Sequence, residues 1–118
     1  MTTRYHVTTA AWTDGDDLLS LDEQINRGLL TEDEARAEWR WGHSFDAATD
    51  RQYVSLWSTL DDVEAWLAML GPDAPAHYTL LACDVDDGSA AYIDRTVEGH
   101  PAVLGSIHGD SITIVRRV

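Results

Sequence analysis

The stretch from Gln52 to Pro72 constrains the fold more than any other part of the chain. Residues 52–57 combine aromatic and β-branched side chains, which is typical of a strand, and Ser58-Thr59 then supplies a helix cap. The next residues place one apolar stripe at helical spacing, made by Leu60, Val63, Leu67 and Leu70. Gly71-Pro72 ends that pattern. The sequence therefore predicts a strand over 52–57 that leads into a helix over 60–70.

The second half of the chain is mainly strand-like. Residues 77–84 are almost continuously apolar, which indicates a strand in the centre of a sheet. Further strands are expected over 90–95, 101–107 and 111–115, and His108-Gly109-Asp110 supplies turn residues between the last two.

The chain also opens on a strand, expected over residues 4–9. Alternation places Tyr5 and Val7 on one face of this strand and Arg4, His6 and Thr8 on the other. One face therefore carries a guanidinium, an imidazole and a hydroxyl group in a row.

Two helices are expected between the first strand and residue 42. The first ends at Gly28, has Asp16 or Asp17 as its N-cap, and rests on the helical spacing of Leu18, Leu21 and Ile25. The second covers 32–41 and begins with a capping box formed by Thr31 and Glu34. With helices concentrated in the first half and strands in the second, we expect an α+β fold. It would be a single compact domain over residues 1–118 with mostly antiparallel sheet.

The charge balance limits the partners of this chain. Its 21 acidic residues face eight Arg and no Lys, which gives a formal net charge of −13. Such a field repels nucleic acid, so an extended nucleic-acid-binding surface is not expected. A basic protein partner is compatible with the same charge.

Other features point to a protein of the cytoplasm. No apolar run approaches the roughly 20 residues of a membrane span. Residues 1–4 lead into a strand instead of the apolar segment of a signal peptide. The lone Cys83 cannot form an internal disulfide and lies in an apolar stretch, so a small buried side chain is expected there.

Common catalytic and metal-binding patterns are absent from the sequence. Asp84, Asp86 and Asp87 have the wrong phase for a calcium loop, and the five His residues lack the paired spacing of a zinc site. We therefore expect no metal. There is no GxSxG nucleophile motif and no glycine-rich phosphate loop followed by a helix.

The order of the elements resembles another class of enzyme. Tyr5-His6-Val7-Thr8 comes first, then residues 53–57 leading into a helix, then the apolar strand, and finally Val97-Glu98-Gly99-His100 before residues 102–107. In this order the chain resembles the small mono-ADP-ribosyltransferases, which use NAD. The resemblance spans most of the chain, although no single matching motif exceeds four residues.

The resemblance implies roles for individual residues. His6 would hydrogen-bond the adenosine ribose of NAD, and Thr8 would help to hold the nicotinamide side. Ser55, or Tyr53 on the same face, would take the position on the middle strand, with Trp57 as a stacking surface for nicotinamide. The strands of His6 and Ser55 would then lie close together, with both side chains opening on one cleft. Glu98 would be the catalytic carboxylate that stabilises the oxocarbenium-like transition state.

One departure from the family pattern concerns this carboxylate. The family's acidic residue usually lies directly before the strand that corresponds to residues 102–107, and His100-Pro101 stand there in this chain. Glu98 lies two residues before His100, and Asp94 is a further candidate for the catalytic carboxylate. Two functions therefore stay open: an NAD-dependent ADP-ribosyltransferase, or a non-enzymatic acidic protein that binds a basic partner, for example as a nucleic-acid mimic.

Overall fold

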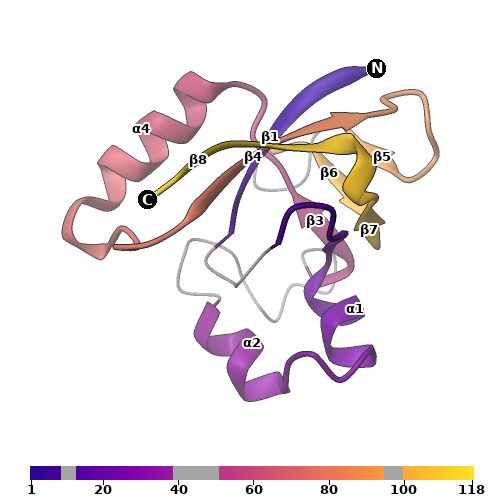
Figure 1. Cartoon of the computed structure of the whole chain (residues 1–118), viewed down its shortest axis with the longest axis horizontal. Helices are drawn as coiled ribbons and strands as arrows, with labels where there is room; N and C mark the ends of the chain where they lie inside the picture. Colours follow the sequence, from indigo (N-terminus) through magenta and orange to yellow (C-terminus); the bar gives the residue numbers. More distant parts are fainter. Residues whose placement is uncertain (9–12, 39–50, 95–99) are drawn as a thin grey trace.

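The computed structural model describes residues 1–8, 13–38, 51–94 and 100–118. Its elements, in chain order, are β1 (Thr2–Thr8), β2 (Leu18–Leu19), α1 (Leu21–Asn26), α2 (Glu32–Glu38), β3 (Tyr53–Ser55), α4 (Leu60–Leu70), β4 (Thr79–Val85), β5 (Tyr92–Ile93), β6 (Ala102–Leu104), β7 (Ser106–Ile107) and β8 (Ile112–Arg117) (Figure 1). Short 3₁₀ turns cover Gly71–Asp73 and Gly109–Ser111. The strand pairings of the described residues are all antiparallel, so the expected α+β class is confirmed. Strands β1 and β2 nevertheless come before α1 in sequence, and β3 lies between α2 and α4.

Strand β4 is the centre of the first sheet, whose strand order is β1-β4-β8. Its alternate residues Leu81, Cys83 and Val85 belong to the main apolar core, while Leu80 is buried on the opposite face. Burial on both faces explains why this segment is almost continuously apolar, as a central strand requires. The prediction of a central strand here is confirmed.

Two more groups of strands complete the structure. The second sheet has the order β3-β6-β5, and β2 pairs with β7 alone. The two three-stranded sheets meet at one isolated bridge between Tyr5 and Trp57. There the Tyr5 amide donates to the Trp57 carbonyl at 2.9 Å and the Trp57 amide donates to the Tyr5 carbonyl at 2.7 Å. Through this bridge, β1 has β4 on one edge and the residues after β3 on the other.

The prediction for the first helix was wrong at its start. Leu18 and Leu19 form β2, and Leu18 pairs with Ile107 inside the core. The helix begins only at Leu21, where the Ser20 hydroxyl accepts from the Glu23 amide at 3.1 Å. Burial of Leu18 against β7 therefore outweighs its helical spacing with Leu21. Asp17 does not cap the helix, because its carboxylate accepts from the Gly109 amide at 2.8 Å.

The other helix boundaries follow the sequence signals. At α2, the Thr31 amide donates to the Glu34 carboxylate at 3.1 Å and the Glu34 amide donates to the Thr31 hydroxyl at 3.2 Å, which is the expected capping box. The last residues predicted for this helix, 39–41, lie outside the described residues. At α4, the Thr59 hydroxyl accepts from the Asp62 amide at 3.1 Å, and the helix ends at Gly71 with φ of 53°.

The single strand expected over 101–107 is in fact two strands. Gly105, with φ of 80°, separates β6 from β7, and its carbonyl accepts from the Ser20 amide at 2.9 Å. A positive φ is a conformation that glycine adopts at low cost, so the chain turns here and moves from one strand pair to another.

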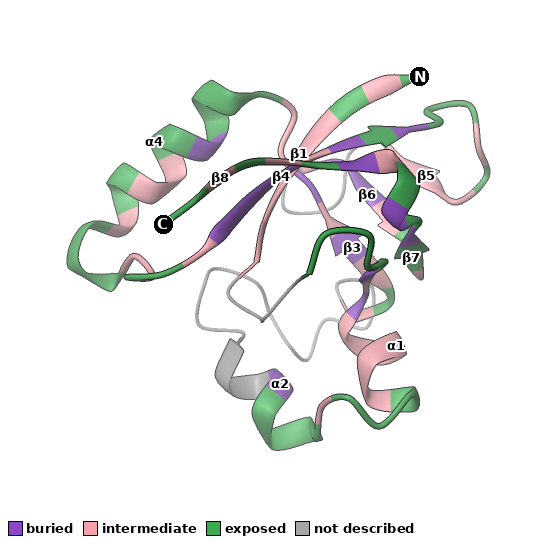
Figure 2. Cartoon of the chain, in the orientation of Figure 1, coloured by how far each residue is buried: buried purple, intermediate pink, exposed green. Residues whose placement is uncertain are grey.

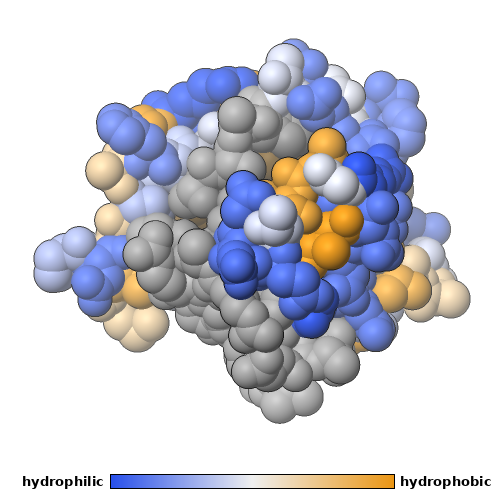
Figure 3. Space-filling model, turned by 90° about the horizontal axis from the view of Figure 1, so that it is seen from below, coloured by the Kyte–Doolittle hydropathy of each residue, from blue (hydrophilic) through white to orange (hydrophobic). Residues whose placement is uncertain are grey.

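Helix α4 lies along the first sheet, on the side away from α1 and α2 (Figure 1). Its Val63 is fully buried, and Glu64 forms an ion pair with Arg116 of β8 at 2.6 Å. By contrast α1 has no fully buried residue, and Leu29 just after it is 63% exposed (Figure 2). Seen from below, most of the described residues in view are hydrophilic, and hydrophobic residues gather near the centre of the view (Figure 3). No helix among the described residues is long and apolar enough to cross a membrane.

Candidate functional site

Three of the residues that the sequence singled out, His6, Ser55 and Trp57, lie where β1 joins the end of β3. His6 is half-buried, and its Nδ1 atom lies 2.7 Å from the backbone carbonyl oxygen of Ser55. A carbonyl oxygen can only accept, so Nδ1 carries the proton and donates this bond. The strands of His6 and Ser55 are therefore neighbours, although the contact uses the backbone of Ser55 and not its hydroxyl group.

The register assigns the side chains at this joint to two faces. Tyr5 and Trp57 are direct partners, so their side chains share one face, and alternation adds Ser55 and Tyr53 to it. His6 lies on the other face of β1, opposite Leu81 of β4. The imidazole of His6 and the hydroxyl group of Ser55 thus lie on opposite faces at the joint, so the expectation that both side chains open on one cleft is wrong.

Arg4 and Thr8 share the face of His6. Arg4 is opposite Cys83, and its Nε atom donates to the Tyr92 hydroxyl at 3.3 Å. Thr8 ends β1 opposite Thr79 and is half-buried. The polar row predicted on β1 therefore exists, and it lies on the core side of the sheet, at the margin of the apolar cluster.

An aromatic group forms on the opposite face. The Trp57 ring lies 4.2 Å from the His100 ring in an edge-on arrangement and 5.2 Å from the ring of Trp66 on α4. We call Trp57, Trp66 and His100 the aromatic trio. Trp57 and His100 continue the register of the β3–β6 pair, in which Ser55 faces Ala102, and the Leu56 amide donates to the Pro101 carbonyl at 2.9 Å.

Sequence reasoning missed Trp66 and His100 as members of this group. Trp66 lies beside the apolar stripe of α4, and His100 was considered only as the residue in place of the family's acid. The strand register, extended from Ser55–Ala102 to Trp57–His100, is the signal that would have placed His100 beside Trp57. That register is not visible in a single sequence.

Of the two candidate catalytic carboxylates, Asp94 lies within the described residues and Glu98 does not. Glu98 lies outside the described residues, two positions before His100. Asp94 is exposed and accepts from the Tyr92 hydroxyl at 3.2 Å. Because Arg4 donates to the same hydroxyl, a chain of hydrogen bonds joins β1 to the end of β5.

The three aspartates that were compared with a calcium loop each accept a hydrogen bond within the protein. Asp84 and Asp87 accept from the hydroxyls of Thr3 and Thr2, and Asp86 accepts from the Gly88 amide at 3.0 Å. The described residues contain no group of three or more His, Cys, Asp or Glu side chains arranged to hold a metal ion.

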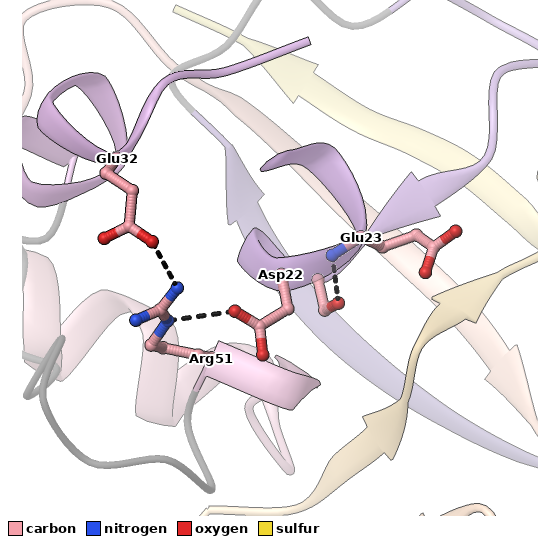
Figure 4. Close-up of polar contacts among 5 residues, drawn as sticks. Asp22, Glu23, Glu32 and Arg51 are labelled. Atoms are coloured by element: carbon pink, nitrogen blue, oxygen red, sulfur yellow. Dashed lines mark hydrogen bonds and ion pairs between the residues drawn. The ribbon is translucent and has the colours of Figure 1, made fainter. Parts of the chain in front are cut away.

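Several arginines are held by carboxylates within the protein. Arg51 lies between Asp22 of α1 and Glu32 of α2, at 2.9 and 3.1 Å (Figure 4). Arg27 pairs with Glu23 at 2.9 Å, and Arg116 pairs with Glu64. Since 21 acidic residues face only eight Arg, most carboxylates cannot have an arginine of their own, and the surface is strongly anionic.

Comparison of the chain with protein-family models, with curated proteins and with solved structures finds no match in any of the three.

Proposed function

We propose that the protein is an NAD-dependent ADP-ribosyltransferase, which cleaves NAD with release of nicotinamide and transfers ADP-ribose to an acceptor. One observation carries the proposal. Three segments that are far apart in sequence meet at one joint. They contain His6, Ser55–Trp57 and His100. These are the segments that the resemblance assigns to NAD, the last of them adjoining Glu98.

The contacts at the joint refine the roles that the resemblance implies. Nδ1 of His6 is occupied by the Ser55 carbonyl, so a bond from His6 to the adenosine ribose would use Nε2. Trp57 would stack against nicotinamide on the face that it shares with Ser55 and Tyr53. Because His6 lies on the other face, NAD would have to pass over the end of the joint to reach both groups.

The proposed chemistry is a displacement at the nicotinamide ribose. The bond between the ribose carbon and the nicotinamide nitrogen breaks, and nicotinamide leaves with the electron pair. Positive charge develops on the ribose, and a carboxylate beside it, Glu98 in this proposal, lowers the barrier. The acceptor nucleophile then bonds to the same carbon and loses its proton to solvent.

A second candidate is a non-enzymatic protein that binds a basic partner. The excess of carboxylates over arginines favours it, because an uncompensated anionic surface attracts basic proteins. This candidate needs neither NAD nor Glu98.

NAD binding separates the two candidates. A ligand at 100 times its dissociation constant stabilises the folded state by about 2.7 kcal/mol, so NAD should raise the melting temperature if the proposal is right. Glu98→Gln should leave NAD binding almost unchanged in calorimetry and lower nicotinamide release by about 10²–10³-fold. Asp73→Asn, which removes an exposed charge, is the control and should keep full activity.

The outcomes have distinct meanings. Absence of both NAD binding and nicotinamide release in the unmodified protein would reject the enzyme and leave the acidic binding protein. Full activity in Glu98→Gln would move the catalytic role to another carboxylate, of which Asp94 is the first to test.

A further inference from the structure

The aromatic trio forms a group of its own on the α4 side of the first sheet. None of its members belongs to the main apolar core, and each is only half-buried. The separations of 4.2 and 5.2 Å are those of rings in contact. All three residues are therefore partly accessible to solvent, and the faces of aromatic rings carry a negative potential.

Two carboxylates lie in the first turn of α4, the helix that carries Trp66. Asp62 precedes Trp66 by one helical turn, and side chains on a helix lean towards its N-terminus, so the Trp66 side chain is expected to be directed towards Asp62. Asp61 and Asp62 are both exposed. Among the described residues no arginine pairs with either, since Arg116, the arginine that contacts α4, is held by Glu64 and Tyr78.

We propose that the aromatic trio and Asp62 form a recognition site for an arginine side chain of a basic polypeptide. A guanidinium group is planar and weakly hydrated, stacks on indole faces and bonds to a carboxylate at its edge. The net charge of −13 attracts such a polypeptide over long distances. Lysine fits less well, because its compact ammonium group keeps its water more strongly.

The aromatic trio shares Trp57 with the proposed nicotinamide surface, but recognition of arginine by this site does not require NAD. It applies equally to an enzyme that must dock a basic protein and to a protein that only binds one. The measurement is therefore made without NAD, so that its failure and a failure of the proposed enzymatic function can be told apart.

The experiment measures fluorescence anisotropy of two short labelled peptides of equal charge, one with arginine alternating with glycine and one with lysine in place of arginine. The arginine peptide should bind more tightly. Trp66→Leu should weaken its binding by about 2- to 30-fold, the range of a cation–π contact. Asp62→Asn should weaken it by about 2- to 5-fold, as expected for an exposed ion pair.

Asp33→Asn is the matched control for charge. Asp33 is an exposed residue of α2, a helix on the other side of the molecule from α4 (Figure 1), and its variant loses the same charge as Asp62→Asn. It should leave binding of the arginine peptide nearly unchanged. Trp66→Phe keeps a ring and should retain most of the affinity, which protects the test if Trp66→Leu is poorly folded.

Three results would overturn the proposal. The first is equal affinity for the arginine and lysine peptides, or no binding of either. The second is an equal loss in Asp33→Asn and Asp62→Asn, which would indicate attraction by net charge alone. The third is unchanged binding in folded Trp66 variants.

Discussion

The imidazole of His6 donates to the backbone carbonyl of Ser55 at 2.7 Å, beside the Tyr5–Trp57 backbone bridge that joins the two three-stranded sheets. In a regular antiparallel ladder the next rung after Tyr5–Trp57 would pair Val7 with Ser55, so that carbonyl would face a backbone amide. Here a side chain of the neighbouring residue supplies the donor. His6 is therefore part of the junction between the sheets.

Removal of this side chain should destabilise the protein. His6→Ala leaves a half-buried carbonyl without its imidazole donor, and the free energy of unfolding should fall by about 1–3 kcal/mol. Urea denaturation should show a lower midpoint with an unchanged slope. His77→Ala, at an exposed histidine, is the control; equal effects of the two substitutions would show that the bond adds no stability.

The contact between Gly109 and Gly15 should tolerate no side chain. A Cβ atom on Gly109 would lie 2.2 Å from the Gly15 carbonyl oxygen, and both partners are backbone, so neither can rotate away. Gly109→Ala should lower the free energy of unfolding by about 2–4 kcal/mol. At Gly88 the atom nearest to an added Cβ is 3.4 Å away, so Gly88→Ala should lower the free energy of unfolding much less. Thermal melts of the two variants measure this difference.

Arg51 should stabilise the packing of α1 against α2. Arg51→Met removes its bonds to Asp22 and Glu32 and leaves two carboxylates facing each other (Figure 4). Since the Arg51 side chain is 24% exposed, solvent screens the interaction, and a loss of about 1 kcal/mol is expected. The loss should shrink at high salt. Arg27→Met, which removes a more exposed pair, should have a smaller effect.

Cys83 should make the protein less stable in alkali. Burial, followed by the charge of Asp84, raises the pKa of its thiol from 9.0 to about 12. The unfolded chain therefore loses this proton at a lower pH than the folded chain. The stabilisation is complete below pH 9.0 and is lost as the pH rises towards 12.

Denaturation at a series of pH values tests this prediction against Cys83→Ala. The variant should be less stable at neutral pH because it leaves a cavity, and its stability should fall less steeply in alkali. A thiol reagent should react slowly with the folded protein and rapidly after unfolding. Rapid labelling of the folded protein would contradict the burial of Cys83.

Local signals predicted the parts of the fold that depend on neighbouring residues. The caps at Thr31 and Thr59 follow from side chains three residues apart, and the stop at Gly71 follows from one glycine and one proline. Leu18 was assigned to a helix because its β partner, Ile107, is near the other end of the chain. No local pattern carries that information.

The candidate site also combines features that local patterns predicted with features that depend on distant parts of the chain. Alternation separated His6 from Tyr5 on the first strand, and the adjacency of the His6 and Ser55 strands was expected. The expectation that the two side chains share one cleft was wrong. The face on which each side chain lies also depends on the register between strands, which the Tyr5–Trp57 bridge sets. Trp66 joins the site through the packing of α4, a tertiary contact that helical spacing alone does not specify.

The bridge between Tyr5 and Trp57 also affects the motions available to the molecule. Sheets that share many rungs resist sliding. Among the described residues these two are joined by one backbone bridge and by two side-chain bonds, from His6 to Ser55 and from Arg4 to Tyr92. A small shear of one sheet past the other would break few hydrogen bonds, and it would change the distances from His6 to both Trp57 and His100. A ligand held between these residues would therefore select one relative position of the two sheets, and its release would restore their freedom to slide.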